Sequence, residues 1–148
     1  MIKIAGAIYP IPLKFVNRIF AEQRNVFVKY VVHESGVKLV PNNKVLFYAS
    51  HGQKEIVGEA TIKAVEFLTP VEAVKKYGDK LFLNKDELMK YASQPSSRTA
   101  SKKMLVLALF KPRKYLMGIK YARHITKAGE YFTDERYNAL VQQAGVLG

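Results

Sequence analysis

The sequence predicts an α+β fold, built as a small mixed β-barrel with short peripheral helices. Three observations support this prediction. Five or six segments have the β-branched and aromatic composition of strands, short helical segments lie among them, and these helices are too few and too uneven for regular βαβ alternation. Neither a repeat nor a linker divides the 148 residues, so we expect a single domain over residues 1–148.

The first half of the chain predicts strands around one early helix. Residues 1–9 alternate in the manner of a short strand, and Pro10 and Pro12 then open a helix, since proline fits a first helical turn. Further strands are expected over residues 25–32, 45–49 and 55–67. Gly58 lies inside the last of these strands and indicates a β-bulge.

The second half has clearer helix signals. Thr69 and Asn84 each begin a capping box with a glutamate three residues later, Gly78 ends the first of these helices, and Thr133 caps a final helix. Residues 93–101 are polar and predict a loop. A strand is expected over residues 103–110. We expect Pro112 to interrupt it before a second strand region over residues 113–125.

Composition excludes several classes of protein. The chain has no cysteine, which excludes disulfides, thiolate zinc sites and a cysteine nucleophile. The three histidines have no metal-ligand spacing, and no Gly-rich phosphate loop is present, so we expect neither metal nor cofactor. No apolar run approaches 18 residues, and the start lacks the layout of a signal peptide. A soluble cytoplasmic protein without a membrane partner is therefore expected.

Positive charge is the dominant feature of the composition. Lys and Arg number 24 against 12 Asp and Glu, a formal net charge of +12, and residues 88–129 contain no carboxylate. This uneven distribution favours a basic face, which attracts nucleic acid. The alternative is a generally Lys-rich proteome with no such partner. The basic residues of the segment are Lys90, Arg98, Lys102, Lys103, Lys111, Arg113, Lys114, Lys120, Arg123 and Lys127.

Several short motifs follow one another in a recognisable order. A Pro-led helix precedes the basic segment RNVFVK (24–29), VLFYAS (45–50) is followed by IVGEATI (56–62), and TPVE (69–72) leads to the turn KYG (76–78). In this order the chain resembles the PUA/ASCH-like superfamily, and more narrowly an uncharacterised archaeal family within it. The resemblance implies a pseudo-barrel whose groove binds RNA, sometimes through a modified base. Because the chain lacks tryptophan, an aromatic cage would use Tyr and Phe.

The early motif supplies the first candidate binding residues. Phe27 and Lys29 share one face of the predicted strand, whereas Val26, Val28 and Tyr30 share the other and are expected to form the barrel interior. An aromatic ring for stacking beside a cation for phosphate suits single-strand binding. Alternatively, Phe27 is core and Lys29 an edge charge. Arg24 and Asn25 precede this pair and complete the first candidate set.

Two further groups complete the predicted interface. Tyr48 and Ser50 end a strand, where the ring could stack on a base and the hydroxyl could bond its edge. The basic residues of the carboxylate-free segment predict a phosphate track that gives affinity without sequence preference. Its members are Arg98, Lys102, Lys103, Lys111, Arg113 and Lys114.

These observations favour an RNA- or nucleotide-binding domain in RNA processing, modification or translation. The alternative that the resemblance offers is an ASCH-type enzyme, a ribonuclease or amidohydrolase acting on RNA or modified nucleosides, with Lys29, Glu59 and Tyr48 as weak catalytic candidates. Arg24 and Phe27 stand where the amidohydrolases of the superfamily carry a lysine and a threonine. Glu59 is also open to a structural interpretation, with Lys29 or Arg24 as its ion-pair partner. A third alternative is an acidic protein partner.

Overall fold

The computed structural model describes residues 3–31, 33–50, 54–93, 102–121, 125–126 and 128–144. In chain order its elements are β1 (Gly6–Ile11), α1 (Leu13–Ala21), β2 (Val26–Lys29), η1 (Glu34–Gly36), β3 (Lys44–Ala49), β4 (Glu55–Leu68), α2 (Pro70–Tyr77), η2 (Gly78–Lys80), α3 (Lys85–Ala92), β5 (Met104–Lys120), β6 (Glu130–Phe132) and α4 (Asp134–Gln143). The α+β class is confirmed, with six strands in one sheet.

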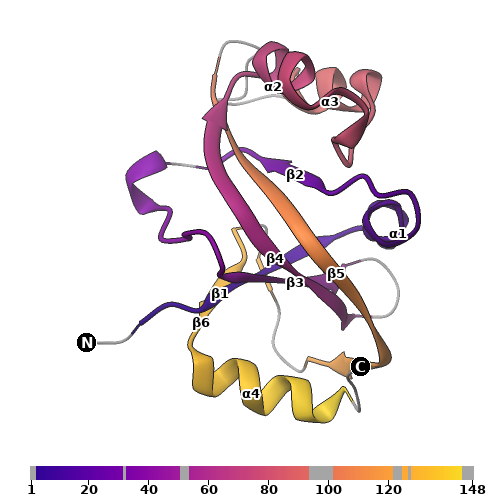
Figure 1. Ribbon diagram of the computed structural model, residues 1–148, viewed down its shortest axis with the longest axis vertical. Coiled ribbons are helices and arrows are strands. Elements are labelled where there is room, and N and C mark those ends of the chain that lie inside the picture. Colours follow the sequence, from indigo (N-terminus) through magenta and orange to yellow (C-terminus); the bar gives the residue numbers. More distant parts are fainter. Residues whose placement is uncertain are drawn as a thin grey trace.

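The sheet has the order β2-β5-β4-β3-β1-β6, so that β2 and β6 are its edges and the predicted barrel is open in the part of the chain that the structure describes. Among the strands that the structure describes, β1 and β3 pair in parallel and the other neighbouring strands pair antiparallel. The long strands β4 and β5 cross the molecule diagonally, with α2 and α3 at one end and α4 at the other (Figure 1). The sheet curls strongly and brings together strands that are distant in its order: Tyr9 of β1 stacks on Phe27 of β2, with 5.3 Å between ring centroids.

A helix fills the curl of the sheet. α1 buries Val16 and Ile19, and its Phe20 packs edge-on against Phe47 of β3. Gly58 allows this approach, since a Cβ at that position would lie 2.3 Å from the ring of Phe20. The β4–β5 register also shifts between Ile56 and Gly58, in agreement with the predicted irregularity. Gly58 therefore serves helix packing as well as strand geometry.

The helix caps agree with the sequence. Thr69 and Asn84 form capping boxes with Glu72 and Glu87, and the Thr133 side chain accepts a hydrogen bond from the backbone N–H of Arg136. These motifs satisfy backbone groups that a helix end leaves unpaired, so they specify helix starts locally. Most of the predicted loop over residues 93–101 lies outside the described residues.

Pro112 does not end the fifth strand, and this prediction is wrong. β5 continues to Lys120, because Glu59 pairs with Arg113 while Thr61 pairs with Phe110, which leaves Lys111 and Pro112 opposite Ala60 alone. Proline is tolerated at such a bulge because the ladder does not require a backbone N–H donor at that position. The other edge of β5 pairs with β2 only from Leu105 to Ala108, so the proline breaks no pairing on that side either.

Candidate nucleic-acid interface

Phe27 lies in the core and not on a binding surface, which contradicts its predicted role in stacking. Its side chain is 4% exposed, and its ring packs against Tyr9 and Phe82. The sequence argument required one face of β2 to be open, but both faces are covered, since Val26 and Val28 are buried too. The core interpretation of Phe27 is therefore the correct one.

Arg24 and Asn25 connect segments of the fold. Arg24 donates a hydrogen bond from Nη1 to the carbonyl of Leu81 at 3.0 Å, and its Nε lies 3.6 Å from the Glu22 carboxylate. The carbonyl of Asn25 accepts a hydrogen bond from the backbone N–H of Leu109 at 2.9 Å. Both residues are half-buried. These contacts hold the start of β2 against η2 and β5.

Lys29 and Lys102 lie at one end of the β2–β5 ladder, although they come from distant parts of the sequence. Lys29 pairs with Leu105, three residues beyond Lys102. The Lys29 ammonium lies 4.7 Å from the ring centroid of Tyr9, and the Lys102 ammonium lies 5.9 Å from that of Tyr30. Both lysines are half-buried. Two predicted binding residues are thus positioned over aromatic rings, a favourable cation–π arrangement.

The aromatic rings beneath these lysines are firmly held. Tyr30 and Tyr91 pack with centroids 5.2 Å apart, and the Tyr91 hydroxyl accepts a hydrogen bond from the Tyr30 backbone N–H at 2.9 Å. Burial, reinforced by the charge of Tyr131, raises the pKa of Tyr9. We call the group formed by Tyr9, Lys29, Tyr30, Tyr91 and Lys102 the seam cluster; it comprises the two lysine–tyrosine pairs at this end of the β2–β5 ladder and the tyrosine that packs on one of them.

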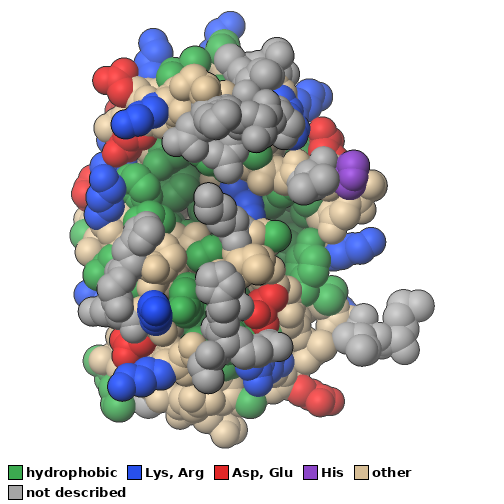
Figure 2. Space-filling view, turned by 180° about the vertical axis from the view of Figure 1, so that it is seen from behind, with side chains coloured by type: hydrophobic (Ala, Val, Ile, Leu, Met, Phe, Trp, Pro, Cys, Tyr) green, Lys and Arg blue, Asp and Glu red, His purple; other side chains and the backbone are tan. Residues whose placement is uncertain are grey.

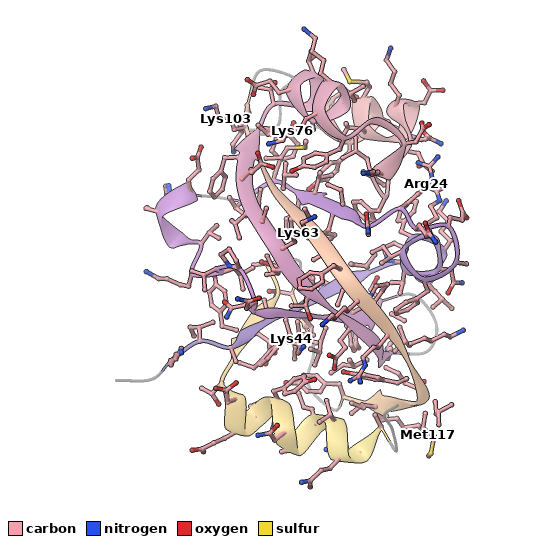
Figure 3. All side chains as sticks on the ribbon, viewed as in Figure 1. Arg24, Lys44, Lys63, Lys76, Lys103 and Met117 are labelled. Carbon is pink, nitrogen blue, oxygen red and sulfur yellow. The ribbon has the colours of Figure 1, made fainter. Side chains whose placement is uncertain are left out.

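The remaining predicted cations are spread along β5 and do not converge on one point. Lys103 is exposed and lies with Lys76 at α2 (Figure 3). The backbone hydrogen bond at Thr69 lowers the pKa of Glu72, and the charge of Lys103 lowers it further. Ten residues separate Lys103 from Arg113, which corresponds to about 30 Å of strand. Lys111, Arg113 and Lys114 are all exposed at and beyond the bulge, whereas Arg98 lies outside the described residues.

Positive side chains are distributed widely over the surface. Figure 2 shows Lys and Arg around most of one face, with apolar side chains exposed between them. Figure 3 adds Lys63 on β4, midway between Lys103 and Lys44; it is exposed where the β4–β5 register shifts between Ile62 and Ala64. Sequence reasoning did not select Lys63, because the position of a bulge decides the direction of its side chain.

Tyr48 is buried and does not present its ring to a base, so this prediction is also wrong. It packs edge-on against Tyr121 in a second apolar cluster beneath α4, which includes Ile8, Leu46 and Leu140. β3 is an interior strand of the sheet, between β1 and β4, and the face of the sheet that carries this cluster is covered by α4. Ser50 follows β3, is half-buried, and donates its backbone N–H to the carbonyl of Ile11.

Glu59 is 1% exposed and is paired within the fold. Its Oε1 accepts hydrogen bonds from the hydroxyls of Tyr115 and Tyr137, both at 2.8 Å, and Oε2 accepts from Tyr137 at 2.9 Å. The Lys44 ammonium lies 3.7 Å from Oε2 and also donates to Thr61. Burial, followed by interaction with Glu59, raises the pKa of both Tyr115 and Tyr137.

The predicted partners of Glu59, Lys29 and Arg24, are wrong. The β3–β4 register places Lys44 opposite Thr61, two residues from Glu59, whereas β5 separates β2 from β4. The weak catalytic candidates Lys29, Glu59 and Tyr48 are therefore not brought together. The contacts of Glu59 with Tyr115, Tyr137 and Lys44 support its structural interpretation, since a buried carboxylate requires such partners.

Three tyrosines of the seam cluster, Tyr9, Tyr30 and Tyr91, were not selected from the sequence. Their signal is weak, because each stands among apolar residues in an ordinary strand or helix pattern. Within the described residues, no three His, Asp or Glu side chains group as metal ligands do. None of the helices in that part of the chain is long and apolar enough to cross a membrane.

Comparison with solved structures identifies the fold. The structure resembles the ASCH protein from Zymomonas mobilis with a TM-score of 0.77 over 93% of this chain and 94% of that chain, at 14% sequence identity. It also resembles the N-terminal domain of McrB from Staphylothermus marinus, with a TM-score of 0.62, 18% identity, and coverage of 97% and 98%. The predicted ASCH/PUA-like arrangement is confirmed.

Sequence comparison places the chain more narrowly. An uncharacterised protein of Methanocaldococcus jannaschii is 31% identical over 106 residues, which cover 68% of this chain and 98% of the relative. Residues 4–134 match the family model described as a domain of unknown function, DUF365. The chain therefore belongs to the DUF365 family, an uncharacterised archaeal family with an ASCH-like fold.

Proposed function

We propose that this protein binds RNA or a nucleotide, with Lys29 and Lys102 of the seam cluster as the phosphate-binding centre and the exposed cations of β4 and β5 as a phosphate track. The observation that carries the proposal is the position of Lys29 and Lys102, whose ammonium groups lie over Tyr9 and Tyr30 at the same end of the β2–β5 ladder. Because Tyr9 and Tyr30 are buried, the ammonium groups and not the rings would contact the ligand, and phosphate is the group that such cations bind.

The distribution of charge supports an extended ligand. From Lys103 through Lys63 to Lys111 and Arg113, exposed cations follow the β4–β5 ribbon for about 30 Å, the length of ten strand residues. Each phosphate that a cation neutralises releases a counterion, so a track of this kind gives an affinity that falls steeply with salt. The same track gives little sequence preference, because phosphates carry no sequence information.

Replacing the two lysines of the seam cluster tests the binding centre. The double variant Lys29→Ala/Lys102→Ala should bind a fluorescent single-stranded RNA about tenfold more weakly than the unsubstituted protein, with a smaller dependence on salt. Lys38→Ala/Lys75→Ala is the matched control, since it removes the same charge from two exposed lysines outside the cluster. Equal losses in both double variants would contradict a binding centre at the seam cluster.

A further inference from the structure

A second exposed feature lies at the far end of β5. Leu116 is 84% exposed and Met117 63%, more than any other large apolar side chain that the structure describes. They are adjacent, and Figure 3 shows Met117 at the outer rim of the molecule, far from Lys103 and Arg24. Exposed apolar side chains gain nothing for folding at such positions, so a neighbouring pair of them suggests an intermolecular contact.

The backbone presents these two side chains by means of a wide bulge. Gly58 pairs with Lys114 and Ile56 pairs with Ile119, so residues 115–118 stand opposite Val57 alone. The bulge is well held on both sides. Tyr115 is buried and donates to Glu59, and Ile119 is buried in the cluster beneath α4. The backbone beneath Leu116 and Met117 is therefore held in place, so binding does not have to order it.

Cations surround the projecting pair. Lys114 and Lys120 flank it in sequence, and Lys111 and Arg113 precede it on the same strand; all four are exposed. Glu55 is the nearby acid: it pairs with Lys120 across the ladder and lies against Gly118. The partner of this surface should therefore be a polyanion that also offers an apolar crevice.

We propose that Leu116 and Met117 form an apolar wedge that inserts against stacked bases of a base-paired RNA stem, while Lys111, Arg113, Lys114 and Lys120 bind the flanking phosphates. Proteins that deform a duplex commonly insert Leu, Met or similar side chains at a base step, with cations on the backbone. The inference rests on the proposed function and adds to it that the ligand is structured.

The number of apolar side chains favours nucleic acid over a membrane surface. A segment that lies in a membrane interface buries a whole apolar face, whereas this bulge offers two side chains. Wedges between base steps are made by side chains such as Leu and Met. The same strand also carries Phe110 with the Lys111 ammonium 5.6 Å from its ring, another cation beside an aromatic ring on the same strand.

The test compares Leu116→Ser/Met117→Ser with the control Val40→Ser/Val71→Ser, which replaces two other exposed apolar residues. Binding is measured to a hairpin RNA that carries a fluorescent adenine analogue in its stem, and to an unpaired RNA of equal length. The wedge variant should lose about tenfold or more in affinity for the hairpin and should abolish the fluorescence change at the stem. Its salt dependence should not change, because every cation remains.

The outcomes separate this inference from the proposed function. Unsubstituted protein that binds neither RNA at low salt would overturn the proposed function. If the unsubstituted protein bound the unpaired RNA but not the hairpin, the wedge alone would be overturned. The same would follow if the wedge variant bound the hairpin as tightly as the unsubstituted protein does. Loss of binding to anionic phospholipid vesicles in the wedge variant, with hairpin binding intact, would also overturn it and would assign the pair to a membrane surface.

Discussion

The two halves of β5 differ sharply in burial and in charge. From Met104 to Leu109 the strand is apolar, and all but one of these side chains are buried. From Lys111 to Lys120 it is basic, and only Tyr115 and Ile119 are buried. The bulge at Lys111 and Pro112 separates the halves. One continuous strand is thus core at one end and surface at the other.

Strand pairing explains the difference. The first half pairs with β2 on one edge and β4 on the other, whereas the second half pairs with β4 alone. The first half lies between two strands and both of its faces are covered, whereas the second half has an open edge, where charge and bulges are common. Position within the sheet therefore decides where this chain can place a binding surface.

The largest expected effect is the difference in stability loss when one leucine is shortened in each half. Leu107→Ala removes a fully buried side chain and should lower the free energy of unfolding by about 2–5 kcal/mol, because it leaves a cavity. Leu116→Ala should change that free energy by less than about 0.5 kcal/mol. Urea unfolding of both variants measures the contrast, and similar losses in the two would contradict the assignment of core and surface.

The second prediction concerns the tyrosine that holds the basic half to the sheet. Tyr115→Phe removes the hydrogen bond to Glu59 and should cost about 1.5–3 kcal/mol at pH 8. Since the pKa of Tyr115 is raised above its ordinary value of 10 by burial and by Glu59, the phenol stabilises the fold fully below pH 10. That contribution is lost as the pH rises above 10, so the difference between the two proteins should narrow. A constant difference up to pH 11 would contradict this.

The bulge itself separates stability from binding. Lys111 has a φ of 52°, a left-handed conformation that favours glycine. Lys111→Gly should therefore raise the free energy of unfolding by up to about 1 kcal/mol. It should also weaken RNA binding and reduce the salt slope by about 0.7, as expected when one phosphate contact is lost. Lys111→Arg is the control that keeps the charge. If the glycine variant bound RNA as tightly as the arginine variant, Lys111 would lie outside the interface.

The smallest effect is expected beside the apolar half, where α1 meets α3. The hydrogen bond from Arg18, which donates to Glu87 at 2.9 Å, is the largest of several interactions that together lower the pKa of Glu87 from 4.5 to about 2; the others are the backbone hydrogen bond at Asn84 and the charges of Arg18 and Lys14. The stabilising contribution is complete above about pH 4.5 and is lost as the pH falls toward 2. Glu87→Gln keeps the capping geometry and should cost less than about 1 kcal/mol at pH 7, because the pair is partly exposed. Its unfolding free energy should then fall less between pH 5 and 3.

Local signals in the sequence predicted local structure well. The capping boxes at Thr69 and Asn84 and the cap at Thr133 depend on contacts within four residues, and all three are confirmed. The α+β class and the ASCH-like arrangement followed from the order of such elements. Pro112 misled the prediction, because whether a proline breaks a strand depends on the register with a distant partner.

The candidate site was predicted less well, because burial is a property of the whole fold. Phe27 and Tyr48 have the chemistry of base-stacking residues, but neighbouring elements cover both. Glu59 required a partner, and the β3–β4 register supplies Lys44. Lys44 is distant from Glu59 in the sequence, so no local pattern indicated this pair. Lys29 and Lys102 were both predicted as binding residues, but their position at the same end of one ladder depends on the antiparallel pairing of β2 with β5.

The central claim is that the cations around the seam cluster and along β5 form a nucleic-acid interface, and a salt titration tests it most directly. Binding of a fluorescent single-stranded RNA should be tight at low salt, and the logarithm of its affinity should fall linearly with the logarithm of salt concentration. The slope should correspond to about four or more phosphate contacts, at about 0.7 for each. No binding at low salt, or an affinity that salt leaves unchanged, would contradict the claim.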